Sequence, residues 1–204
     1  MSKGTLFTIS APSGAGKTSL VKALLQRDSR IQVSVSHTTR AMRPGEVDGK
    51  DYCFVSHDTF NNMILDRVFL EHAQVFENQY GTSKTWVEEA LSQGIDVILE
   101  IDWQGAQQVR EIMPATQSIF ILPPSRDALY ERLTGRGQDD EKVINQRMQA
   151  AIDEMSHYHE SHWLLINDQF ELALQQLHDI IQTQRLQTDK QEGNYSDLLD
   201  DLLH

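Results

Sequence analysis

The stretch TLFTISAPSGAGKTS, residues Thr5–Ser19, decides the fold of this 204-residue chain. Residues 5–9 are apolar and β-branched, which predicts a buried strand. Residues 20–25 repeat apolar side chains at helical spacing. A strand, a glycine-rich turn and a helix in this order predict a phosphate-binding loop, because the backbone N–H groups and the helix N-terminus then face one anion.

In loops of this kind the lysine reaches the β- and γ-phosphates and the next hydroxyl ligates Mg²⁺, so Lys17 and Thr18 are the candidates here. The usual pattern G-x-x-x-x-G-K-S/T begins with glycine, whereas this chain has Ala11, which fits only where φ is not positive. The alternative is a glycine-rich turn that binds nothing. The candidate ATP-binding residues of the loop are Ala11, Pro12, Ser13, Gly14, Ala15, Gly16, Lys17 and Thr18.

Composition limits the partners of the chain. The net charge of −12 argues against a nucleic acid or an anionic membrane as the partner, although a local basic site can still bind a small phosphate. The single cysteine, Cys53, excludes an internal disulfide framework, and it is expected to be a small core residue. With no signal peptide and no run of membrane-spanning length, a soluble cytoplasmic protein is expected.

The rest of the chain alternates apolar runs with amphipathic segments, which is typical of an α/β fold. Further core strands are expected at 31–36, 95–102, 118–122 and 163–167, and helices at 84–93, 104–113 and 170–186. Residues 36–84 indicate a strand-rich insert, with strands at 51–55 and 69–76, a helix at 57–68 and a turn at 78–83. A short amphipathic helix at 196–203, after a polar stretch at 189–193, is expected to dock on a neighbour or to fray.

Charged side chains follow two of these strands. Glu100 and Asp102 lie two apart on one side of a strand end, a place where Mg²⁺ or a substrate donor group is held; the alternative is an acidic end exposed to water. Arg40 and Arg43 suit phosphate oxygens, but two solvated surface arginines would give the same pattern.

A further group of arginines lies between two expected helices. Arg132, Arg136 and Arg147 bracket Gly135 and Gly137, which suits a mobile lid over a triphosphate, although an ordinary helix–turn–helix with solvated arginines fits equally well. His157, His159 and His162 lack the i,i+4 spacing that would place two metal ligands on one helix face, so a polar connector is expected there.

Taken together, several motifs between about residue 4 and about residue 186 resemble the guanylate kinases of bacteria. The motifs lie at 10–19, 35–40, 43–46, 79–82, 101–105, 135–137 and 166–168. The resemblance implies a P-loop NTPase-type parallel-sheet core flanked by helices (1–35, 85–124 and 148–190), a small α+β GMP-binding insert (36–84), a helical lid (125–147) and an acidic tail (191–204). It implies transfer of the ATP γ-phosphoryl to GMP, and to dGMP, giving ADP and GDP, with Mg²⁺ as the cofactor of ATP.

The resemblance also assigns roles by position. It implies that the GMP phosphate is held by Arg40, Arg43, Tyr52 and Tyr80. It implies that guanine is read by Ser36, Glu71, Thr82 and Asp102. Lys17, Arg136 and Arg147 would be catalytic, and Arg132 and Asn167 would contact ATP. Glu100 stands where the family usually has aspartate, and it is a candidate for GMP binding or for Mg²⁺.

Three other functions were weighed. A non-catalytic interaction module with a guanylate-kinase-like fold would have a degraded phosphate loop, whereas Lys17 and Thr18 are intact here. A kinase for another acceptor, such as a ribose bisphosphate, would leave the guanine-reading set without a purpose. A signalling GTPase would need an Asn-Lys-x-Asp motif, but Asn167 and Asp168 are followed by Gln169. The sequence leaves the oligomeric state open.

Overall fold

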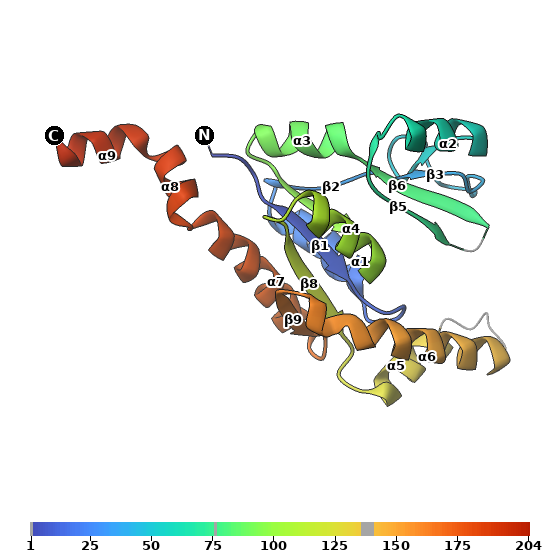
Figure 1. Ribbon diagram of the computed structural model, residues 1–204. Helices are drawn as coiled ribbons and strands as arrows, with labels where there is room; N and C mark the ends of the chain where they lie inside the picture. The colour runs from blue at the N-terminus through green and yellow to red at the C-terminus, as the bar shows by residue number, and fades with distance from the viewer. Residues whose placement is uncertain (1, 76, 136–140) are drawn as a thin grey trace.

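The computed structural model describes residues 2–75, 77–135 and 141–204. At its centre is a five-stranded sheet in which all neighbouring strands pair parallel (Figure 1). In sheet order the strands are β2 (Ile31–Val33), β7 (Asp96–Glu100), β1 (Leu6–Ser10), β8 (Gln117–Leu122) and β9 (Trp163–Ile166). The predicted parallel α/β core is confirmed. All five carboxyl ends therefore meet at one edge of the sheet, where such folds bind ligands.

Helices cover both faces of this sheet. One face packs on α1 (Lys17–Arg27) and α7 (Phe170–Arg185), and the other packs on α3 (Lys84–Ser92) and α4 (Trp103–Ile112). Side chains alternate along a strand, so Phe7 and Ile9 of β1 belong to the first cluster while Leu6 belongs to the second. Each fully buried side chain of this size contributes about 1.5–3 kcal/mol.

A second, four-stranded sheet follows the core strand β2. Its order is β4 (Cys53–Phe54), β3 (His37–Thr38), β6 (Asn78–Ser83) and β5 (Phe69–Val75), and helix α2 (His57–Leu65) precedes β5. The turn predicted at 78–83 is wrong: these polar residues form β6, which pairs with strands on both sides. Cross-strand pairing has overridden local propensity here. The predicted strand at 31–36 ends at Val33, because the chain then leaves the core sheet for the second one.

Between β8 and β9 the chain forms α5 (Arg126–Thr134), α6 (Glu141–Met155) and the short 3-10 turn η1 (Ser156–Glu160). The hydroxyl of Ser125 accepts a hydrogen bond from the Ala128 amide at 3.0 Å, so Ser125 caps the N-terminus of α5. In Figure 1, α5 and α6 lie on one side of the core and the four-stranded sheet lies on the other. The carboxyl end of β1 therefore lies between two outlying parts of the chain.

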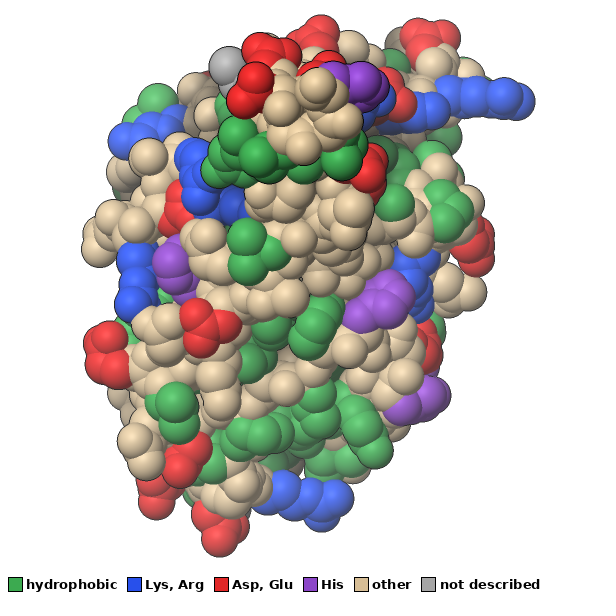
Figure 2. Space-filling model, turned by 90° about the vertical axis from the view of Figure 1, so that its left-hand side faces the viewer, with side chains coloured by type: hydrophobic (Ala, Val, Ile, Leu, Met, Phe, Trp, Pro, Cys, Tyr) green, Lys and Arg blue, Asp and Glu red, His purple; other side chains and the backbone are tan. Residues whose placement is uncertain are grey.

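The C-terminal residues form two helices, α8 (Thr188–Asn194) and α9 (Ser196–Leu203). The polar stretch at 189–193 lies within α8, whose Lys190 ammonium donates to the Lys3 and Gly4 carbonyls. Helix α9 leaves its leucines exposed, and Figure 2 shows hydrophobic side chains at the surface on this side of the molecule. Of the helices within the described residues, none has both the length and the apolar character needed to cross a bilayer.

Candidate active site

The loop between β1 and α1 needs glycine at two positions. Gly14 and Gly16 have φ values of 92° and 93°, in the left-handed region that side chains disfavour. A Cβ on Gly14 would lie 2.9 Å from Leu129 Cδ1, and one on Gly16 would collide with the Asn167 amide nitrogen. Ala11 is buried and its φ is not positive, so alanine fits the first position of the motif.

This loop borders a pocket of about 380 Å³. The residues that line it are Ala11, Pro12, Ser13, Gly14, Gly16, Lys17, Thr18, Ser19 and Glu154. All of these residues except Ser19 and Glu154 were predicted to bind ATP. The remaining loop residue, Ala15, is buried and turns its carbonyl to Asn167.

Lys17 carries the positive charge of this pocket. Burial lowers the pKa of its ammonium, and the carboxylates of Glu100, Glu154 and Asp102 partly oppose that shift. None of these three carboxylates forms an ion pair within 4 Å of Lys17 in the described part of the chain. The lysine is therefore held in a desolvated place without a contacting partner, which suits a group that meets a phosphate oxygen.

Thr18 and Glu100 bring two oxygen donors together at the end of β7. The Thr18 hydroxyl donates to Glu100 Oε2 at 3.1 Å. Hydroxyl and carboxylate oxygens suit Mg²⁺, which usually keeps several waters and binds through one or two side chains plus substrate phosphates. Within the described residues, groups of three or more His, Cys, Asp or Glu side chains able to hold a metal are absent. The donor set thus fits a magnesium ion that arrives with a nucleotide.

Two predicted ATP-binding residues lie behind the loop and support it. The Asn167 amide donates to the Ala15 carbonyl at 2.7 Å, and Asn167 is 5% exposed. Arg132 Nη2 donates to the Asn167 carbonyl at 3.0 Å, while its Nη1 is buried without a hydrogen-bond partner among the described atoms. These contacts fix the loop backbone from β9 and α5.

A second group of predicted residues gathers around Glu71 of β5. Glu71 is 4% exposed, and the hydroxyl of Thr82, its register partner on β6, donates to Glu71 Oε1 at 2.6 Å. Burial raises the pKa of Glu71 to about 7; the Thr82 hydrogen bond opposes this shift and the charge of Asp102 adds to it. Ser36 lies one residue before β3, next to the same sheet.

Asp102 belongs to a helix cap. The sequence placed it on one side of a strand with Glu100, but β7 ends at Glu100 and Asp102 instead caps α4, accepting from the Gly105 amide at 2.8 Å. A Cβ on Gly105 would lie 3.1 Å from Glu71 Oε2, so the start of α4 lies directly against the Glu71 carboxylate. The predicted carboxylates of Glu71 and Asp102 therefore lie close together, although β5 supplies the first and the start of α4 supplies the second.

The third group lies around β3, β4 and β6 of the four-stranded sheet: Arg40 follows β3, Tyr52 precedes β4 and Tyr80 belongs to β6. Arg40 pairs with Glu46 at 2.7 Å, and its guanidinium lies 5.4 Å from the centre of the Tyr52 ring. The Tyr52 and Tyr80 rings lie 5.9 Å apart. The Arg43 amide donates to Glu46 Oε2 at 2.7 Å, while the Arg43 side chain is exposed. Arg40, Tyr52 and Tyr80 are thus close together, with Arg43 on the adjoining loop.

Of the predicted lid arginines, Arg147 is half-buried on α6, and Arg136 lies outside the described residues. Glu154, which lines the phosphate-loop pocket from the same helix, is in none of the sequence motifs. It follows Arg147 by seven residues, and that spacing places two side chains on one helix face. The spacing was the signal that could have identified it.

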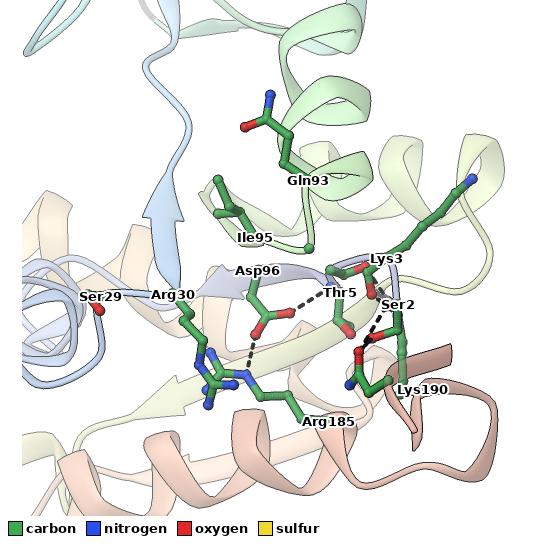
Figure 3. Close-up of a pocket in the computed structure, with 13 residues that line it drawn as sticks. Ser2, Lys3, Thr5, Ser29, Arg30, Gln93, Ile95, Asp96, Arg185 and Lys190 are labelled. Carbon is green, nitrogen blue, oxygen red and sulfur yellow. Dashed lines mark hydrogen bonds and ion pairs between the residues drawn. The ribbon is translucent and has the colours of Figure 1, made fainter. Parts of the chain in front are cut away.

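Another pocket, of about 320 Å³, lies at the opposite end of the core sheet (Figure 3). Here Asp96 accepts from the Thr5 amide at 2.7 Å and from Arg185 Nε at 2.6 Å, as the dashed lines in Figure 3 show. Arg185 Nη1 also donates to Asp28 at 2.6 Å. Arg185 thus pairs with two carboxylates through Nε and Nη1, although its Nη2 is buried without a partner among the described atoms, so these ionised groups link the elements at this end of the sheet.

Comparisons with known proteins agree with this geometry. The family model described as "Guanylate kinase" matches residues 3–184. A guanylate kinase of Saccharophagus degradans is 62% identical over 200 residues, 98% of each chain, and one of Methylococcus capsulatus is 59% identical over 203 residues, 100% of each chain. The crystal structure of guanylate kinase from Anaplasma phagocytophilum superposes with a TM-score of 0.76 at 32% identity, covering 93% of this chain and 90% of that one. The chain therefore belongs to the guanylate kinase family.

Proposed function

We propose that this chain transfers the γ-phosphoryl group of ATP to GMP, and to dGMP, giving ADP and GDP or dGDP. The observation that carries the proposal is the buried carboxylate of Glu71 on the second sheet, which lies near Asp102 at the start of α4 while an intact phosphate loop borders the core sheet. The group around Glu71 suits the base of the acceptor, and the phosphate loop suits the phosphates of the donor.

Guanine is recognised by the group around Glu71. Guanine offers adjacent N1–H and N2–H₂ donors, and an ionised carboxylate accepts both. Thr82 fixes the orientation of that carboxylate, and Ser36 and Asp102 add polar contacts around the base. AMP presents an acceptor at N1 and would leave Glu71 buried and unpaired, which supports discrimination of about 10⁴ or more.

The phosphate of GMP is held by Arg40, Arg43, Tyr52 and Tyr80. In the present arrangement Arg40 is paired with Glu46 and packed near the Tyr52 ring, so its guanidinium is already oriented. Arginine matches phosphate oxygens bidentately, and the two phenols add hydroxyl donors.

The donor phosphates lie in the loop, where Lys17 contacts the β- and γ-phosphates and Arg147, with Arg136, stabilises the transferring group. Thr18 and Glu100 would hold Mg²⁺, which when bound would neutralise charge on the donor phosphates. Phosphoryl transfer needs no covalent protein intermediate, so alignment and positive charge account for the catalysis.

The chain divides accordingly into a core (1–35, 85–124 and 148–190), a GMP-binding insert (36–84), a lid (125–147) and a tail (191–204). Closure of the insert and the lid over the core would bring acceptor and donor together and exclude water, which would otherwise hydrolyse ATP.

The test is ADP release with Mg²⁺ and ATP in the presence of GMP, dGMP, AMP, CMP or UMP in turn. Turnover is expected with GMP and dGMP only. Glu71→Gln should reduce kcat/KM for GMP by about 30-fold. This factor corresponds to about 2 kcal/mol, the contribution of a hydrogen bond to a charged group. Turnover with a different acceptor would contradict the assignment of the substrate, and binding of GMP without any turnover would favour an interaction module.

A further inference from the structure

We propose that Glu154 makes the phosphate-loop pocket selective for ATP that carries a divalent cation, and acts against metal-free ATP. The inference rests on the proposed use of ATP as the donor. It assigns a specificity-determining role to a residue that no motif of the family resemblance included.

Glu154 faces the loop from across the pocket. It lies one residue before the end of α6 and is the acidic side chain among those that line this pocket. Among the described residues, no side chain forms a hydrogen bond or an ion pair with its carboxylate. Its charged neighbours are Lys17 of the loop, Asp102 at the start of α4 and His157 of η1.

A structural carboxylate would have partners. Asp28, at the other end of the sheet, accepts from Arg185, Gln182 and the Arg30 amide. Glu154 is half-buried without such bonds, and burial raises its pKa to about 7 although Lys17 opposes the shift. Burial of this carboxylate without a hydrogen-bond partner carries a desolvation cost. Because the carboxylate lies beside a pocket for polyanions, its charge affects the binding of any charged ligand that enters the pocket.

The electrostatics of the pocket give that action a direction. Glu100, Glu154 and Asp102 each interact electrostatically with Lys17, and of these three carboxylates Glu154 is the one that lines the phosphate-loop pocket. Metal-free ATP brings its full negative charge into this field, whereas a bound divalent cation cancels two of those charges. Ionised Glu154 therefore lowers the affinity for metal-free ATP by about fivefold, which is the scale of a screened charge pair a few ångströms apart. It lowers the affinity for the magnesium form less.

The experiment measures ATP binding by calorimetry at pH 8, where the Glu154 carboxylate is ionised, once with EDTA and once with excess Mg²⁺. Glu154→Gln is expected to bind metal-free ATP about fivefold more tightly and the magnesium form only about twofold more tightly. Glu154→Asp keeps the charge and should keep the wild-type ratio of the two affinities. Asp153→Asn is the matched control, because it removes one charge from the same turn of α6 at an exposed position, and it should change neither affinity.

An unchanged ratio in Glu154→Gln, or an equal change in both affinities, would overturn the inference. A wild-type protein that binds neither form would instead refute the proposed function, so the two failures are distinguishable. Circular dichroism checks the fold of each variant, and Glu154→Ala gives the same comparison if the glutamine variant does not fold.

Discussion

At the amino end of the core sheet, Arg185 of α7 donates to Asp96 and to Asp28 at 2.6 Å each, joining β7, α7 and the residue that follows α1. Burial raises the pKa of Asp28, but hydrogen bonds from Arg185 and the Arg30 amide outweigh burial and hold that pKa at about 2. The ionised groups at this end therefore stabilise the fold.

At the carboxyl end of the same sheet, Lys17, Glu71 and Glu154 have no ion-pair partner within 4 Å among the residues that the structure describes. Burial lowers the pKa of Lys17, and it raises the pKa of Glu71 and of Glu154 to about 7. Each of these shifts disfavours the charged form, so each charge costs stability in the absence of a ligand. The contrast separates charges that hold the fold together from charges that await a substrate.

The largest effect is expected from removing the charge of Lys17 at the carboxyl end of the core sheet. Lys17→Met should lower kcat/KM for ATP by about 10³-fold, or about 4 kcal/mol, because it removes a donor to the transferring phosphates. The free energy of unfolding should not fall, since burial makes the ammonium unfavourable in the folded state. Steady-state kinetics and urea denaturation of the same preparation check both parts, and a loss of stability in this variant would contradict the comparison.

The converse result is expected at the amino end. Arg185→Met should lower the free energy of unfolding by about 3 kcal/mol at pH 7, because it removes the guanidinium that pairs with two buried carboxylates. At 25 °C kcat/KM should stay within about twofold, as the residue lies far from the phosphate loop along the sheet.

The pH dependence of this loss provides its control. Since the folded pKa of Asp28 is depressed, its stabilisation is fully present above the unfolded pKa of about 3.9 and is lost as the pH falls through about 2. Urea denaturation at pH 7 and pH 3 should show the difference between the wild type and Arg185→Met shrinking. An equal difference at both pH values would mean that lost packing, and not lost charge pairing, destabilises the variant.

The two ends also differ in how far the sequence could predict them. The phosphate loop lies within 15 consecutive residues whose types specify a strand, a tight turn and a helix, so pattern alone was sufficient. Arg185 and Asp96 are 89 residues apart and belong to a helix and a strand with ordinary patterns. Their pairing depends on how α7 packs against the sheet, which no local periodicity encodes.

Similar limits apply within the site itself. The family resemblance assigned roles to Glu71 and Thr82 individually by position, but only the structure shows that they are register partners on β5 and β6 and that the hydroxyl donates to the carboxylate. The polar stretch 78–83 has the composition of a turn, and its strand conformation comes from pairing with β3 and β5. Glu154 was missed because its helix enters the site only through tertiary packing.

A smaller effect should appear in the pH dependence of acceptor binding. With a pKa of about 7, Glu71 is mostly ionised at pH 8 and mostly protonated at pH 6, and only the ionised form accepts both guanine donors. The KM for GMP should therefore rise about tenfold from pH 8 to pH 6, or about 1.4 kcal/mol. Glu71→Gln is the control, because it retains the ionisation of the GMP phosphate itself; an equally steep profile in this variant would assign the titration elsewhere.

The smallest effect tests whether the amino end extends to the C-terminal helices. Asn194 of α8 accepts from the Ser2 amide at 3.0 Å and from the Ser2 hydroxyl at 3.1 Å, and both bonds are exposed to solvent. Water replaces such bonds at little cost, so Asn194→Ala should lower the free energy of unfolding by only about 0.5 kcal/mol. Hydrogen exchange should nevertheless quicken in α8 while β1 and β7 stay protected, because α8 has no buried residues to hold it. Quickened exchange in β7 as well would mean that α8 belongs to the cooperative unit that Arg185 holds together.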